Sequence, residues 1–302
     1  MSSIIKVCDL TKSFSEIHAV DHLNFTVEEK EVYGFIGQNG AGKSTTIRML
    51  LTLIQPDSGD IEMFGMSLKK HRIDILRRTG AIIEKPDLYK YMTAFENLKL
   101  FGLLSGVQLN EKQLMDQLHL VGIADRAHSK VKTFSQGMRQ RLGIAVALVH
   151  DPDLVILDEP LNGLDPQGIA DIRQLVKHLS KDKGKTIFIS SHLLTEMEQV
   201  ADSLLVIHKG KKVAEGKTNE LLNPELNDIE VETDSAEIVM AWLQNTKWGK
   251  YLKQVDKGRI IIRIKRSEVP GFIQMLSQST LPVYSIRQRN SLEDYFLSMT
   301  TK

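Results

Sequence analysis

The chain has 302 residues, more than one ordinary core requires, so we expect one large domain and a smaller one. A formal net charge of +1 provides no bulk field to attract nucleic acid or an anionic membrane. No apolar run reaches about 18 residues, so we expect no transmembrane helix. The one cysteine, Cys8, excludes an internal disulfide, and its neighbours IIKVCDL predict a buried strand position.

The first part of the chain is predicted to form short strands, with one helix after a glycine-rich loop. β-branched and aromatic residues dominate these strands, and turn residues separate them. The expected strands are 4–10, 23–27, 31–37, 58–65 and 79–84, and the expected helix is 43–53.

A helical insert is expected over about residues 86–150, where leucine and phenylalanine recur at helical spacing. Thr93 with Glu96 and Asn110 with Gln113 have the form of capping boxes, which begin helices. The insert therefore interrupts a domain that is otherwise rich in strands.

The next segment returns to buried strands. DLVILDEP, residues 153–160, is a continuous apolar run that ends in two carboxylates, as in a strand buried on both faces. A helix follows with Asp165 as N-cap and Pro166 at its first position. TIFISSH, residues 186–192, is predicted as another buried strand, and 204–216 as a hairpin around a Lys-Gly turn.

The last part of the chain alternates again between strands and helices, which predicts a separate α+β unit of ferredoxin-like type. The expected strands are 229–233, 259–265 and 283–288, and the expected helices are 236–245, 270–278 and a closing helix at 291–300.

GQNGAGKST, residues 37–45, follows a strand, opens a helix and fits the pattern G-x-x-x-x-G-K-[ST]. The glycines let the backbone wrap a phosphate with its N–H groups, and the helix N-terminus adds partial positive charge. Lys43 is expected to reach the β- and γ-phosphates, and the Ser44 hydroxyl to hold Mg²⁺. The alternative is a glycine-rich turn with a chance lysine, but the strand and helix around the loop favour a phosphate site.

Three side chains near strand ends have the chemistry that ATP hydrolysis needs. Asp158 can hold Mg²⁺, and Glu159 can orient or deprotonate a water that faces the γ-phosphate. His192 is expected at the same sheet edge, where it can hydrogen-bond the γ-phosphate. The alternatives are a strand end that only caps a turn and a histidine with a structural role.

The order GQNGAGKST, FSQGM, LVILDEP, LNGLD and ISSH resembles the ATP-binding subunit of an ABC transporter. The resemblance implies an α/β fold, in which a P-loop NTPase core carries an N-terminal antiparallel β subdomain and a helical insert. It implies an ATPase domain at 1–222, with its helical subdomain at about 86–150. The rest, 223–302, is then a small C-terminal α+β accessory domain of ferredoxin-like type.

The resemblance also implies site residues, with ATP and Mg²⁺ as cofactors. Catalytic roles fall to Glu159 and His192. The implied ATP-binding residues are Phe14, which would stack on adenine, and Gly37, Gln38, Asn39, Gly40, Ala41, Gly42, Lys43, Ser44 and Thr45. The implied metal ligands are Ser44, Glu84 and Asp158. Phe14 has the alternative of a core position in a hairpin.

FSQGM occupies the place of the family's LSGGQ signature, which acts in trans on ATP held by the P-loop of a second subunit. The implied residues are Ser135, Gln136 and Gly137 of the signature, and Asn162, Gly163, Leu164 and Asp165 of the D-loop at the dimer seam. The alternative for Ser135 is an ordinary helix N-cap.

Two departures from the family pattern stand out. Phe134, Gln136 and Met138 replace the common Leu, Gly and Gln of the signature. Glu84 stands where the family usually has the glutamine of the Q-loop, and this variant is similar to subunits of bacitracin-type and lantibiotic-immunity exporters.

The resemblance predicts an ATPase, most simply a homodimer, that powers a separate multi-spanning permease at the cytoplasmic face of the membrane. The expected cargo is a peptide antibiotic, a drug or a lipid-like compound, and no nucleic-acid partner is expected. One alternative is a soluble ABC ATPase that acts on ribosomes or DNA, but the chain lacks the second ATPase domain or long coiled coil of such proteins. The other is a non-hydrolysing regulatory module, which Glu159 argues against.

Overall fold

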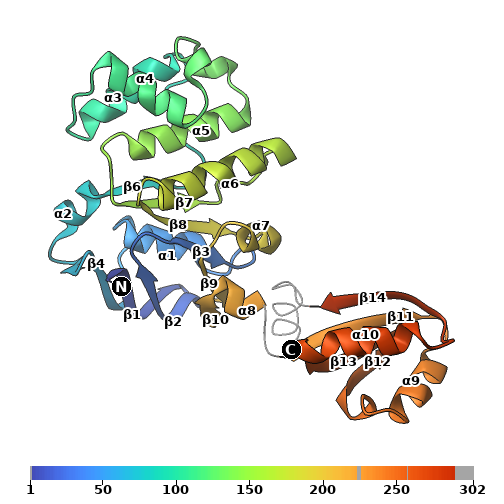
Figure 1. Cartoon of the computed structure of the whole chain (residues 1–302). Coiled ribbons are helices and arrows are strands. Elements are labelled where there is room, and N and C mark those ends of the chain that lie inside the picture. Colours follow the sequence, from blue (N-terminus) through green and yellow to red (C-terminus); the bar gives the residue numbers. More distant parts are fainter. Residues whose placement is uncertain (1, 223–225, 257, 290–302) are drawn as a thin grey trace. The chain divides into compact units, whose positions relative to one another are not determined.

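The computed structural model describes residues 2–222, 226–256 and 258–289 (Figure 1). The chain divides into two compact units, Met1–Thr218 and Asn219–Lys302. The helix expected at 291–300 lies outside the described residues. Within the described ranges, no helix has both the length and the apolar character that a membrane crossing requires.

The first unit begins with an antiparallel sheet in the order β2-β1-β4-β5. Its strands are β1 (Ser3–Phe14), β2 (Ile17–Glu28), β4 (Ser58–Met63) and β5 (Met66–Ser67). The expectation of a buried Cys8 was wrong, because Cys8 is exposed. Successive side chains of a strand point to opposite faces, so Ile5 and Val7 enter the core while Lys6 and Cys8 face outward.

A six-stranded sheet in the order β10-β9-β3-β8-β7-β6 forms the centre of this unit. Its strands are β3 (Val32–Ile36), β6 (Thr79–Ile82), β7 (Leu154–Asp158), β8 (Thr186–Ser191), β9 (Ser203–His208) and β10 (Lys211–Lys217). All neighbours are parallel except β9 and β10, which form the expected hairpin. The strands β3, β7 and β8 are buried along their whole length, which explains their continuous apolar sequence.

The two sheets of the first unit share one core. Phe25 of β2 packs against Tyr33, Phe35 and Phe188 of the central sheet, with ring centroids 6.0–6.1 Å apart. To this core, α1 (Lys43–Leu50) and α2 (Arg72–Arg77) contribute Ile47, Met49, Leu50 and Ile75, whereas α6 (Pro166–Lys181) and α7 (Leu194–Glu198) contact strands of the central sheet. Helix α8 (Thr218–Leu222) begins where the unit ends. As predicted, Asp165 caps α6, since its side chain accepts a hydrogen bond from the Gly168 N–H at 2.8 Å.

The helical insert contains α3 (Ala94–Leu104), α4 (Glu111–Leu120) and α5 (Gln136–Leu148), which lie together at one end of the first unit (Figure 1). Both expected capping boxes are confirmed: Thr93 pairs with Glu96, and Asn110 with Gln113.

The C-terminal unit is an antiparallel sheet in the order β12-β13-β11-β14. Its elements follow the chain order β-α-β-β-α-β, so the predicted ferredoxin-like type is confirmed. They are β11 (Leu226–Thr233), α9 (Ala236–Gln244), β12 (Leu252–Asp256), β13 (Arg259–Lys265), α10 (Val269–Ser277) and β14 (Val283–Arg289). The prediction missed β12, which among the described strands pairs with β13 alone at the edge of the sheet and lacks an apolar pattern.

Candidate active site

The parallel strands of the central sheet bring the predicted motifs to one edge. The last residue of β3, Ile36, lies opposite Ser191 of β8, and Asp158 of β7 lies opposite Ser190. The segments that leave these strands are the glycine-rich loop, Glu159 and His192. Because parallel strands end on the same side, residues more than 100 positions apart in sequence become neighbours.

The two ends of the glycine-rich loop are tightly enclosed, and the glycines there, Gly37 and Gly42, are structurally required. Gly42 has a φ of +106°, and a Cβ atom there would lie 2.2 Å from the carbonyl oxygen of Ala19. A Cβ atom at Gly37 would lie 2.7 Å from the carbonyl oxygen of Ile207. Other side chains at these positions would force the loop out of its path, so the glycines keep its N–H groups in place at the start of α1.

Lys43 is buried, and its ammonium group lies across the loop. Its Nζ donates to the carbonyl oxygens of Gly37 at 2.6 Å and Gln38 at 3.2 Å. The same Nζ lies 3.1 Å from Oε1 of Glu159. This contact is an ion pair without hydrogen-bond geometry, since Oε1 receives no hydrogen bond. The predicted phosphate lysine and the predicted catalytic glutamate are therefore direct neighbours.

Glu159 is held from several sides. Its second carboxylate oxygen, Oε2, lies 2.8 Å from Nδ1 of His192, and its backbone N–H donates to Ser190 Oγ at 3.0 Å. Its backbone has a φ of +51°, a conformation that non-glycine residues seldom adopt and that is concentrated at functional sites. Only 16% of the side chain is exposed, so Glu159 faces a sheltered space in which it can orient a water molecule.

Asp158 is fully buried, and one of its two carboxylate oxygens has no hydrogen-bond partner. Its Oδ1 accepts from Ser190 Oγ at 2.5 Å, while Oδ2 is buried without a hydrogen-bond partner. An unpaired buried anionic oxygen is costly unless a cation or donor approaches it, so it fits a divalent ion. No three His, Cys, Asp or Glu side chains of the described ranges gather as a metal site. The remaining oxygens must then come from hydroxyls such as Ser44, from water or from phosphate.

Glu84, the third predicted metal ligand, is engaged elsewhere. Its Oε1 lies 2.8 Å from Nη2 of Arg48, and 62% of its side chain is exposed. Arg48 lies four residues after Ser44 in α1, so the two share a helix face about one turn apart. Glu84 is thus paired with the helix that carries Ser44, and its role as a ligand stays a prediction.

The signature segment begins α5. Ser135 is the N-cap, and its Oγ accepts from the Met138 N–H at 3.2 Å. The Gln136 side chain reaches the D-loop of the same chain, where Nε2 donates to the carbonyl oxygen of Asn162 at 3.0 Å. The distance from Leu164 Cδ2 to a Cβ atom placed at Gly137 would be 3.8 Å. Signature and D-loop therefore lie side by side within one subunit.

Phe14 ends β1 with 47% of its surface exposed, so it is not a core residue. Lys12 lies with its Nζ 5.5 Å from the Phe14 ring centroid. The partly exposed ring can stack on a planar base, and stacking on adenine stays a prediction.

Sequence reasoning missed Ser190 and Arg48. Ser190 hydrogen-bonds with both Asp158 and Glu159. The signal was present as a polar residue at the end of the apolar strand TIFISS. Arg48 had no such signal, because its partner Glu84 is 36 residues away in sequence.

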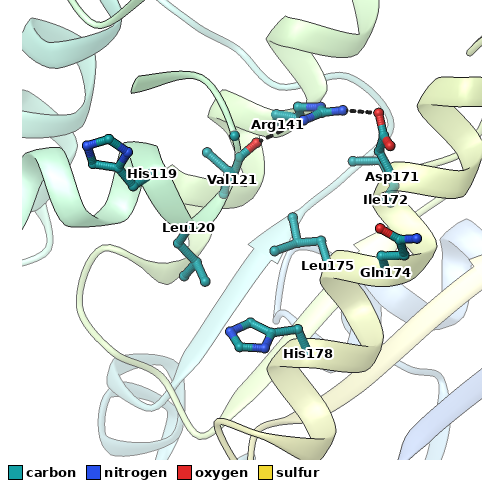
Figure 2. A pocket seen from close by; sticks show the side chains of 10 residues that line it. His119, Leu120, Val121, Arg141, Asp171, Ile172, Gln174, Leu175 and His178 are labelled. Carbon is teal, nitrogen blue, oxygen red and sulfur yellow. Dashed lines mark hydrogen bonds and ion pairs between the residues drawn. The ribbon is translucent and has the colours of Figure 1, made fainter. Parts of the chain in front are cut away.

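A separate cavity of about 310 Å³ lies where the helical insert meets α6 (Figure 2). Its lining includes His119, Arg141 and His178, and none of the predicted nucleotide-binding residues. Arg141 spans it, with an ion pair to Asp171 of α6 and a hydrogen bond of 3.3 Å to the carbonyl oxygen of Val121. Arg141 thereby joins the insert to the core.

Comparison with known proteins agrees with this arrangement of motifs. The family described as ABC transporter matches residues 20–162. The chain is 42% identical to the bacitracin transport ATP-binding protein BcrA of Bacillus licheniformis, over 99% of this chain and 98% of that protein. It is 41% identical to the lantibiotic transport ATP-binding protein SrtF of Streptococcus pyogenes, over 70% of this chain and 90% of that protein.

Among solved structures, the chain is similar to an ATP-binding subunit of an ABC transporter. That match has a TM-score of 0.63 and 32% identity, and covers 72% of this chain and 91% of the other. The chain therefore belongs to the ABC transporter family as an ATP-binding subunit, an ATPase that powers a transport system.

Proposed function

We propose that this ATPase acts with Mg²⁺ at the cytoplasmic face of the membrane and powers a permease that exports a peptide antibiotic of the bacitracin or lantibiotic class. The observation that carries the hydrolytic part is the convergence of Lys43, Asp158, Glu159 and His192 at one sheet edge. The cargo class is supported by the likeness to BcrA and SrtF.

The contacts at that edge support the following roles. The loop 37–45 and Lys43 bind the phosphates, and Ser44 and the free Oδ2 of Asp158 hold Mg²⁺. The ion supplies charge neutralisation at the transferred phosphoryl group. Glu159 orients or deprotonates the attacking water. His192 forms a hydrogen bond through Nδ1 with Oε2 of Glu159 and thereby keeps the carboxylate oriented toward the site.

Hydrolysis requires two subunits in this proposal. Ser135 and Gly137 at the start of α5 present a hydroxyl, a backbone N–H and a helix N-terminus, which together suit the γ-phosphate bound by a partner. Asn162 to Asp165 line the seam between the subunits. We assign 1–222 to this ATPase domain, and 223–302 to an accessory domain.

The helical insert offers the surface for the permease. Tyr89, Tyr91, Leu103 and Leu104 are all large, apolar and exposed, and Tyr91 is 82% exposed. The ring of Tyr89 lies 6.0 Å from that of Phe101 in α3, so the loop before α3 and the helix form one surface. A short amphipathic helix on the cytoplasmic side of the permease would cover these side chains.

The test is to co-express the chain, in a bacitracin-sensitive host, with the separate permease that it is proposed to power. We expect copurification from membranes, ATPase activity stimulated by the permease, and bacitracin resistance that is lost with Glu159→Gln. Copurification with ribosomes in place of the permease would contradict the transport assignment. Copurification without resistance would contradict the bacitracin cargo, and the same assay with a lantibiotic then tests the other class.

A further inference from the structure

The hydrogen bond from Gln136 to the D-loop has a consequence for catalysis. Gln136 Nε2 donates to the carbonyl oxygen of Asn162 at 3.0 Å. The family pattern has glycine at this position of the signature, and glycine has no side chain to make this bond. The contact therefore belongs to the sequence variant FSQGM that this chain carries.

The D-loop is shaped to receive this amide. Gly163, which follows Asn162, has a φ of +71°. A Cβ atom at Gly163 would lie 2.6 Å from Gln136 Nε2 and 3.4 Å from its Oε1, so a larger residue there would displace the amide group, the far end of a flexible side chain, from this position. The glycine of one segment and the glutamine of the other are thus sterically matched.

The same turn leads directly to Glu159. The Asn162 N–H donates to the carbonyl oxygen of Glu159 at 3.1 Å, which closes a turn between them. Glu159 itself has the left-handed φ of +51°, so its position depends on the contacts around it. A bond that holds Asn162 therefore restrains the backbone of the carboxylate that acts on water.

We propose that Gln136 is a positioning residue that ties the signature segment to the D-loop of its own subunit, so that closure of the signature on the partner's nucleotide sets the position of Glu159. This inference rests on the proposed dimeric mechanism. It goes beyond that mechanism, because Gln136 acts on its own subunit's catalytic glutamate and not on the partner's phosphate.

The first test is Gln136→Met, which keeps the side-chain length and a high helix propensity at the first residue of α5 but has no N–H group. We expect kcat for ATP to fall about 2- to 10-fold, the range of one lost hydrogen bond, while KM and the affinity for a fluorescent ATP analogue change less than about twofold. The unfolding midpoint should fall only slightly, because the lost hydrogen bond is exposed. An unchanged kcat, or a loss that appears mainly in KM or in the unfolding midpoint, would overturn the tether.

The second test is a double-mutant cycle of Gln136→Gly and Gly163→Ala, read as kcat. The left-handed φ penalises alanine at 163 in both backgrounds, but the collision with the amide occurs only where Gln136 is present. We expect Gly163→Ala to lower kcat several-fold more in the Gln136 protein than in the Gln136→Gly background. Effects that multiply independently would contradict a direct contact.

A control separates this inference from the proposed mechanism. Glu159→Gln with Mg²⁺ and ATP should form dimers by light scattering, with or without Gln136→Met. A Glu159→Gln protein that stays monomeric, with the permease present, contradicts the dimeric mechanism itself. If Glu159→Gln forms dimers but Gln136→Met has an unchanged kcat, the dimeric mechanism stands and only the proposed role of the Gln136–Asn162 bond is contradicted.

Discussion

The central sheet of the first unit and the sheet of the C-terminal unit have similar apolar strands but different strand directions. LVILD of β7 and the isoleucines of β13 are buried alike. The strands β3, β7 and β8 are parallel and release their loops at one edge, whereas β11 and its neighbours are antiparallel and end at opposite edges. Strand direction therefore decides whether polar residues gather at one place.

The carboxylates of the two sheets differ accordingly. Asp158 keeps a buried oxygen without a hydrogen-bond partner. Asp228 of β11 has both oxygens engaged, by Arg263 at 2.6 and 3.0 Å and by Lys253 at 2.8 Å. An unpaired buried oxygen calls for a ligand, whereas a fully paired carboxylate serves the fold. We therefore expect substitution of a carboxylate at the edge of the first sheet to lower kcat, and substitution of Asp228 in the second sheet to lower the free energy of unfolding.

The largest expected effect is that of Glu159→Gln. Because the amide cannot accept a proton from water, we expect kcat to fall about 100-fold or more while ATP binding is retained. Phosphate release and equilibrium binding of nucleotide measure the two quantities. The matched control is Glu232→Gln on β11, whose carboxylate accepts only from Ser285 Oγ among its described hydrogen bonds, at 2.9 Å, and which should leave kcat unchanged. Equal losses in both variants would refute the division between the sheets.

An intermediate effect is expected for Arg48→Met. The ion pair of Arg48 with Glu84 is exposed, so its loss should cost at most about 1 kcal/mol of unfolding free energy. If Glu84 is drawn to Mg²⁺, its release from Arg48 should lower the Mg²⁺ concentration for half-maximal nucleotide binding by about 1.4- to 5-fold, which is the same free energy. Titration of a fluorescent nucleotide with Mg²⁺ measures this shift. In the Glu84→Gln background, Arg48→Met should no longer change the Mg²⁺ concentration for half-maximal nucleotide binding. If the change persists, the effect of Arg48 on Mg²⁺ does not act through Glu84.

The smallest effect on activity is expected for Asp228→Asn. Burial alone would raise the pKa of Asp228, but the hydrogen bonds from Arg263 and Lys253 outweigh it and hold the pKa below its ordinary value. The pair therefore stabilises the C-terminal unit above the unfolded pKa of 3.8, and this stabilisation is lost as the pH falls through the lower folded pKa. We expect the variant to lose about 1–3 kcal/mol at neutral pH, with ATPase activity unchanged.

Tryptophan fluorescence can follow this change separately, because Trp242 and Trp248 are the chain's two tryptophans and both lie in the C-terminal unit. Denaturant titrations measure the free energy of unfolding of wild type and of Asp228→Asn. The difference between the two free energies should be smaller at acid pH than at neutral pH. A difference that is constant with pH would show that Asp228 is not stabilised as an anion.

Local sequence predicted much of the fold because its signals are local. Thr93 and Asn110 predicted the two capping boxes, and Asp165 predicted the start of α6. The apolar run before Asp158 predicted a strand buried on both faces. The glycine-rich loop was predictable for the same reason, since its spacing and its flanking strand and helix are contiguous in the chain. Cys8 was misplaced because its face depends on strand register, which a short apolar motif does not specify.

The sequence by itself determined which residues we propose for the chemistry of this ATPase: the loop from Gly37 to Thr45, and the carboxylates Asp158 and Glu159. Only the tertiary structure decided how they meet. Lys43 lies against Glu159, Arg48 holds Glu84, and Gln136 reaches the D-loop because parallel strands and packed loops bring distant segments together. Such contacts have no local sequence signal, since each depends on the strand order and on the space that glycines such as Gly163 leave open.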